Sequence, residues 1–88
     1  MAALTLFPLG EVVITPGAVA LEIDFKPYLK RHQSGDWGNI SKENAEINDL
    51  CVNLEYPLAS LYAVDTKCFL IVTEQDRSTT TVCLPSEF

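Results

Sequence analysis

The sequence predicts a small α+β domain in which an N-terminal strand and two or three short helices precede a three-stranded antiparallel meander packed against the helices. Two observations predict it. Apolar residues recur at helical spacing before Pro57, and after it they follow the pattern of strands separated by short polar turns. The 88 residues are 48% hydrophobic and 20% charged, which supports one packed core and excludes disorder. We therefore expect a single domain over residues 1–88.

The expected first strand covers residues 11–15. This run, Glu-Val-Val-Ile-Thr, is rich in β-branched side chains, and the Pro16-Gly17 pair that follows it is a turn signal. Proline is also tolerated at the start of a helix, so the segment 18–23 is compatible with a short helix.

A second helix is expected after Asp24, whose carboxylate is a candidate N-cap. The helix must end before Gly35, because the segment 35–39 has the composition of a turn and offers two glycines for positive φ angles. Four side chains of this helix fall at helical spacing: Phe25, Tyr28, Leu29 and His32.

Ser41 is the candidate N-cap of a third helix over residues 42–52, and acidic residues in its first turns favour the helix dipole. The stripe expected to be buried consists of Ile47, Leu50, Cys51 and Leu54.

The last part of the chain is predicted to form the meander. Its strands are expected at residues 58–64, 68–73 and 79–84, joined by a tight turn and by the polar loop 74–78. The second of these strands is apolar without alternation, which suits a central strand covered on both faces.

The charge balance argues against direct nucleic-acid binding. Six basic residues against 12 acidic residues give a net charge of −6, and such a chain repels phosphate backbones and acidic membranes. An acidic domain is suited instead to docking on the basic surface of a protein that handles nucleic acid.

The three cysteines, Cys51, Cys68 and Cys83, are odd in number and lack C-x-x-C spacing, so we expect no zinc site and no other metal or cofactor. Reduced cysteines that pack as small apolar residues suit the cytosol. The sequence has no basic leader before Pro8 and no apolar run of membrane-spanning length, so a cytoplasmic protein without membrane contact is expected.

Two polar segments, 31–38 and 73–81, carry groups that could do chemistry. Between them His32, Glu74, Arg77 and Thr79 offer a base, an acid, a phosphate clamp and a hydroxyl, the inventory of a metal-independent ribonuclease or toxin-like enzyme. That enzyme would need a basic face, which the composition does not provide.

Both segments also have a structural interpretation. His32 and Gly35 suit a helix C-terminus, and Trp37 could fold back over the core as a lid. In the second segment, an ion pair of Arg77 with Asp76 or Glu74 could hold the loop, with threonines on the solvent face of an edge strand.

We expect a binding protein rather than an enzyme. Glu43, Glu46 and Asp49 recur every three residues on the third predicted helix and are the candidate acidic contact face. Further candidate contacts are Asp36, Trp37 and Asp76. A homodimer that uses residues 50–54 as its seam is a further possibility.

The motif HQSGDWG at His32–Gly38 and the motif TExDRSxTTxxLP at Thr73–Pro85 resemble those of a family of small bacterial proteins often carried on plasmids and other mobile elements. The opening residues 5–18 share the likeness, and some members carry a label linking them to restriction systems. The sequence departs from the usual pattern at the turn 65–67 and at residues 51–54, where it is more apolar.

A mobile-element context implies one of two roles. One is an inhibitor of a host defence complex, of the anti-CRISPR or anti-restriction type, that occludes a nucleic-acid-binding surface. The other is the small RNA-cleaving enzyme described above. The negative charge favours the inhibitor.

Overall fold

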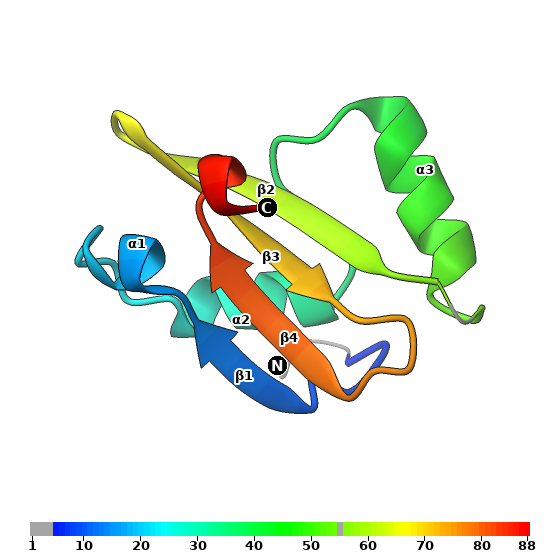
Figure 1. Cartoon of the computed structure of the whole chain (residues 1–88). Helices are drawn as coiled ribbons and strands as arrows, with labels where there is room; N and C mark the ends of the chain where they lie inside the picture. The colour runs from blue at the N-terminus through cyan, green and yellow to red at the C-terminus, as the bar shows by residue number, and fades with distance from the viewer. Residues whose placement is uncertain (1–4, 55) are drawn as a thin grey trace.

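The computed structural model describes residues 5–54 and 56–88 (Figure 1). Along the chain lie β1 (Glu11–Ile14), α1 (Pro16–Val19), α2 (Lys26–Gln33), α3 (Lys42–Cys51), β2 (Leu58–Val64), β3 (Lys67–Thr73), β4 (Thr79–Cys83) and the 3-10 helix η1 (Pro85–Glu87). The α+β class and the order of strands and helices agree with the prediction.

The four strands form one mixed sheet in the order β1-β4-β3-β2. β2, β3 and β4 make the antiparallel meander that the sequence predicts. The predicted three-stranded sheet is nevertheless incomplete, because β1 adds to β4 in parallel, with Glu11 opposite Thr79 and Ile14 opposite Val82. As a result β4 is an inner strand and β1 is an edge.

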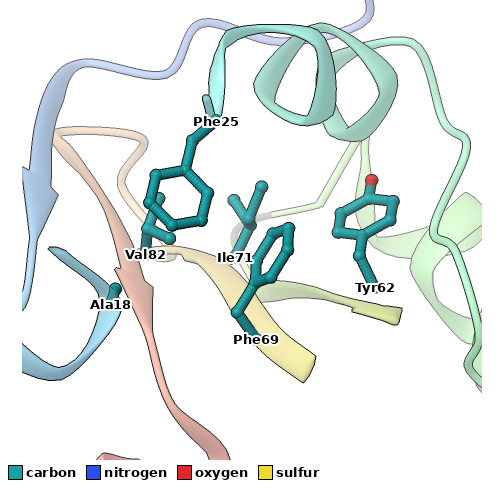
Figure 2. Close-up of a cluster of buried hydrophobic side chains, with 6 residues drawn as sticks. All are labelled: Ala18, Phe25, Tyr62, Phe69, Ile71 and Val82. Carbon is teal, nitrogen blue, oxygen red and sulfur yellow. The ribbon is translucent and has the colours of Figure 1, made fainter. Parts of the chain in front are cut away.

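One face of the sheet carries the main core (Figure 2). α2 lies across this face (Figure 1), and its aromatic side chains meet those of the strands. Phe25 packs edge-to-face on Phe69 with ring centroids 4.9 Å apart, a geometry that aromatic quadrupoles favour. The buried cluster consists of Ala18, Phe25, Tyr62, Phe69, Ile71 and Val82.

A second cluster joins α3 to the rest of the fold. Phe7, Trp37 and Leu58 form its buried centre. The Phe7 and Trp37 rings are stacked 6.1 Å apart, and Trp37 is only 3% exposed. The expectation that Trp37 folds back over the core is therefore correct.

α3 begins as predicted but buries a different side. Ser41 Oγ accepts the N–H of Asn44 at 3.1 Å and caps the helix. Ile47, Leu50 and Leu54 were expected to be buried, yet they are 55%, 71% and 51% exposed. The helix docks through the opposite side, where the buried Asn48 amide donates to Ala59 O at 2.8 Å.

The start of α2 also departs from the expectation. Phe25 occupies the N-cap position and makes no side-chain cap, while Asp24 Oδ1 accepts the N–H of Lys26 at 3.2 Å from one residue further out. The helix ends before Gly35, as predicted, and Gly35 has a φ of 88°.

The three cysteines are free, and their burial differs. Cys83 is buried and Cys51 is half-buried, in line with the expected packing role. Cys68 is exposed at the start of β3, so it does not pack in the core as predicted.

Candidate functional site

The two polar motifs meet inside the protein at His32. The imidazole projects from α2 toward the sheet and is fully buried. Its Nδ1 lies 2.5 Å from Ser60 Oγ on β2, and its Nε2 lies 2.9 Å from Thr73 Oγ1 on β3. Thr73 Oγ1 is in turn 2.8 Å from Thr80 Oγ1 on β4. The network therefore ties α2 to three strands.

The direction of the hydrogen bonds in this network can be worked out from Thr80, whose hydroxyl has a backbone acceptor. Thr80 Oγ1 donates its proton to Leu9 O at 2.7 Å, so it accepts from Thr73. Because the single Thr73 proton is used there, Thr73 accepts from His32 Nε2–H. When the ring is neutral, Nδ1 carries no proton and accepts from Ser60. The network thus places the proton of a neutral imidazole on Nε2.

The environment of His32 agrees with this assignment. Burial, and secondarily the positive charge of Arg77, lower the pKa of His32 from 6.5 to about 4. Ser60, Thr73 and Thr80 have no exposed surface either. A Ser–His pair would suit nucleophilic catalysis, but here no substrate reaches it, so the network's role is structural.

Arg77 is the second anchor. It has a φ of 60°, and its guanidinium lies against the end of α3 and the loop that follows, with Cζ 5.7 Å from the Phe7 ring centroid. Nη2 donates to Cys51 O at 2.8 Å and to Leu54 O at 3.0 Å, and Nη1 donates to Tyr56 O at 2.6 Å. Cys51 O lies at the end of α3, whereas Leu54 O and Tyr56 O lie in the loop that follows, so Arg77 both caps α3 and ties down that loop.

The expected ion pair of Arg77 with Asp76 or Glu74 is not what holds the loop. Arg77 binds backbone carbonyls, including Glu74 O at 3.1 Å. Asp76 Oδ1 instead accepts the Ser78 hydroxyl at 2.6 Å and its N–H at 3.0 Å, and these bonds lower the pKa of Asp76.

The four candidate catalytic residues do not share a cleft. His32 faces the covered side of the sheet, as does Thr80, so the neighbouring Thr79 points to the opposite side. The exposed Glu74 lines a pocket of about 230 Å³ on that opposite side, together with Thr15, Val72, Thr81, Cys83, Glu87 and Phe88. Thr80 is buried in an inner strand, which corrects the expected solvent-facing threonines.

The turn after α2 closes the outer edge of β2. Leu61 N–H donates to Trp37 O at 3.2 Å, and Asn39 N–H donates to Leu61 O at 2.6 Å. Gly38 has a φ of 76°, and a Cβ there would lie 2.1 Å from Leu61 O, so only glycine fits. The HQSGDWG segment therefore works as an edge cover.

Two of the predicted partner contacts have roles in this turn. Asp36 Oδ2 accepts from Arg31 Nε at 2.7 Å, an exposed ion pair that lowers the pKa of Asp36. Trp37 Nε1–H donates to Asp49 Oδ1 at 2.9 Å. Asp36 and Asp49 are thus both exposed and engaged, whereas Trp37 is buried.

The outer face of α3 combines the remaining acidic candidates with apolar side chains. Glu43 and Glu46 are exposed, and residues three and four positions apart share a helix face. Ile47 and Leu50 lie on that same face, and Leu54 follows just beyond the helix. The sequence indicated the carboxylates, whereas it assigned Ile47 to the buried stripe and gave Leu50 and Leu54 both a place in that stripe and a place in a possible dimer seam.

Over residues 5–54 and 56–88 the structure contains no group of three or more ligating side chains that could hold a metal ion. Nor is any helix in this part of the chain long and apolar enough to cross a membrane. Comparison with family models, with curated proteins and with solved structures finds no match for this chain.

Proposed function

We propose that the protein is a small acidic binding module that docks through α3 on the basic, nucleic-acid-binding surface of a partner protein. The observation that carries this proposal is the outer face of α3. Three apolar side chains, Ile47, Leu50 and Leu54, are more than half exposed beside Glu43 and Glu46. A contiguous apolar patch bordered by charge is typical of a protein interaction site.

The position of α3 supports this role. Figure 1 shows the helix at the periphery, beside β2 and away from the layer formed by α2. Its inner side is held by Asn48 and its end is capped by Arg77, so the outer face is presented on a fixed element. A preorganised face loses little conformational entropy on binding.

The charge of the chain selects the kind of partner. The net charge is −6, and three of the six basic side chains are used within the fold. Arg31 pairs with Asp36, Arg77 binds carbonyls, and Lys67 Nζ donates to Leu21 O at 2.8 Å. A basic surface that normally holds a phosphate backbone attracts such a molecule, which then blocks the nucleic acid.

In the mobile-element context that the sequence motifs imply, the partner is a host defence complex, either a restriction enzyme or a CRISPR effector. The metal-independent ribonuclease is the weaker alternative, because His32 is buried and neutral and lies on the other side of the sheet from Glu74 and Thr79.

Competition with DNA tests the proposal. A purified type I restriction complex or CRISPR effector is loaded with fluorescently labelled DNA, and anisotropy reports its release as the protein is added. We expect release by the wild type. The double variant Glu43→Lys and Glu46→Lys should be weaker by roughly tenfold or more, because it opposes the partner's field.

A matched control separates the α3 face from net charge. Glu22→Lys with Asp65→Lys makes the same change of charge at exposed sites, in the region of α1 and of the β2–β3 turn, far from α3 (Figure 1). This control should retain most of the competition. Equal loss in both double variants, or no release of DNA by the wild type from either class of complex, would refute the proposal.

A further inference from the structure

The two edges of the sheet differ in whether other backbone covers them. The outer edge of β2 is covered by the turn after α2 through the Leu61 and Asn39 hydrogen bonds. The outer edge of β1 pairs with no strand in the part of the chain that the structure describes (Figure 1). β1 is thus the one edge of this sheet, as described, that is open to another strand.

The hydrogen bonds between β1 and β4 show which backbone groups point outward. Glu11 N–H donates to Ser78 O at 2.9 Å, and Thr15 N–H donates to Val82 O at 3.0 Å. In a parallel ladder alternate residues of a strand bond to the same neighbour. The N–H and C=O groups of Val12 and Ile14 therefore point away from the sheet.

Apart from its short length of four residues, this edge lacks the features that keep edge strands from pairing. Between Glu11 and Ile14 there is no lysine, no proline and no bulge. Val12, Val13 and Ile14 are 39%, 41% and 39% exposed, so apolar side chains flank the free backbone groups on both faces. Such an edge favours addition of a further strand.

We propose that two copies of the chain pair through β1 in an antiparallel arrangement, with the two-fold axis at Val13. Each Val12 then lies opposite the Ile14 of the other copy, and the two pairs form four hydrogen bonds between outward-pointing groups. Glu11 falls opposite Thr15 and not opposite the second Glu11, so no like charges face each other across the pairing.

A second copy fits better than an extended peptide of another protein because the edge is self-complementary in this register. The same three residues, Val12 to Ile14, supply donors, acceptors and apolar contacts to both sides, which is the requirement of a two-fold interface. The pairing also ends at two copies, since the β2 edge of each is covered. This inference is independent of the proposed docking through α3.

Disulfide cross-linking tests the register directly. Val13 would face its own copy in a non-hydrogen-bonded pair, where Cα atoms are about 4.5 Å apart, within disulfide range. In a background with Cys51→Ser and Cys68→Ser, Val13→Cys should form a covalent dimer on mild oxidation. The matched variant Val12→Cys should form no such dimer. In this register each residue 12 lies opposite residue 14 of the other copy, so the two introduced thiols do not face each other.

Sedimentation at several concentrations tests the role of the backbone. Val12→Pro removes an outward N–H while leaving the bonds to β4, and we expect it to weaken dimerisation roughly tenfold to a hundredfold. Val12→Thr keeps that N–H and nearly the same shape, so it should still dimerise.

The inference is overturned by a wild type that stays monomeric over the whole range, or by a folded Val12→Pro variant that dimerises like the wild type. The inference is also contradicted if Leu50→Asp abolishes dimerisation and Val13→Cys forms no covalent dimer, because these two results together would place the seam on α3.

Discussion

Acidification should destabilise the protein through one residue, His32. When the pKa of a base is lower in the folded state than in the unfolded state, the unfolded state binds the proton more tightly. A fall in pH therefore favours unfolding. His32 has a folded pKa of about 4 against an ordinary 6.5. The stability associated with its neutral form is therefore complete above about pH 6.5 and is lost progressively as the pH falls toward 4.

The size of the effect follows from the two pKa values. Their difference corresponds to about 3.4 kcal/mol, at about 1.36 kcal/mol per pH unit between them. About 2.5 kcal/mol of it falls between pH 7 and pH 4.5. Burial is the larger cause of the lowered pKa, and the positive charge of Arg77 adds to it with the same sign.

Two measurements check this prediction. The chain has a single histidine, so its imidazole signals in a nuclear magnetic resonance titration belong to His32 and should not titrate above about pH 5. Urea unfolding at pH 7 and pH 4.5 should show the loss of free energy. His32→Gln cannot titrate and should show a much smaller change over the same interval.

Carboxylates set the lower limit of the useful pH range. Hydrogen bonds lower the pKa values of Asp36, Asp76 and Glu87, so their contributions are lost only as the pH falls further. An imidazole that titrates near pH 6.5 would refute the reasoning. An equal pH dependence in the wild type and in His32→Gln would do so as well.

Two further predictions concern the anchors of the fold. Arg77→Met should lower the free energy of unfolding by about 2–4 kcal/mol in chemical denaturation, since carbonyls at the end of α3 and in the loop after it lose the guanidinium donor; a change near zero would contradict the capping role. Gly38→Ala should cost about 2 kcal/mol or more in the same assay, because its Cβ would meet Leu61 O at a φ of 76°, and an unchanged melting temperature would contradict the tight fit.

Local signals in the sequence were sufficient for most elements. The three strands of the meander lie within a residue or two of their predicted limits, because turn residues and strand periodicity both mark them. Ser41 caps α3 as predicted. The pairing of β1 with β4 was missed, since it joins residues as far apart as Glu11 and Thr79 and no local pattern reports a parallel neighbour.

The orientation of α3 could not be read from its pattern. An apolar stripe normally marks the buried side of a helix, and this rule assigned Ile47 and Leu50 to the core. The structure buries Asn48 instead, because its amide finds a backbone acceptor at the β2 edge. Sequence periodicity reports that a helix is amphipathic, but not whether its apolar side meets its own chain or another.

The candidate site was also only partly predictable. The sequence singled out His32 as a candidate base and Arg77 as a candidate phosphate clamp, yet nothing in it indicated that Ser60 and Thr80 would be buried with His32. Hydroxyl groups enter a core when every donor and acceptor is paired, and that condition depends on three-dimensional neighbours.

The positions of these residues change how loss-of-function variants must be interpreted. Substitutions of His32 or Arg77 remove interactions that hold α2 and α3 to the sheet, so an inactive variant at either position would report unfolding as readily as chemistry. Glu43 and Leu50 are exposed, and their substitution leaves these networks intact. A loss of function at α3 in a variant with unchanged unfolding would therefore identify a contact surface, whereas a loss at the buried motifs would identify only the scaffold that presents it.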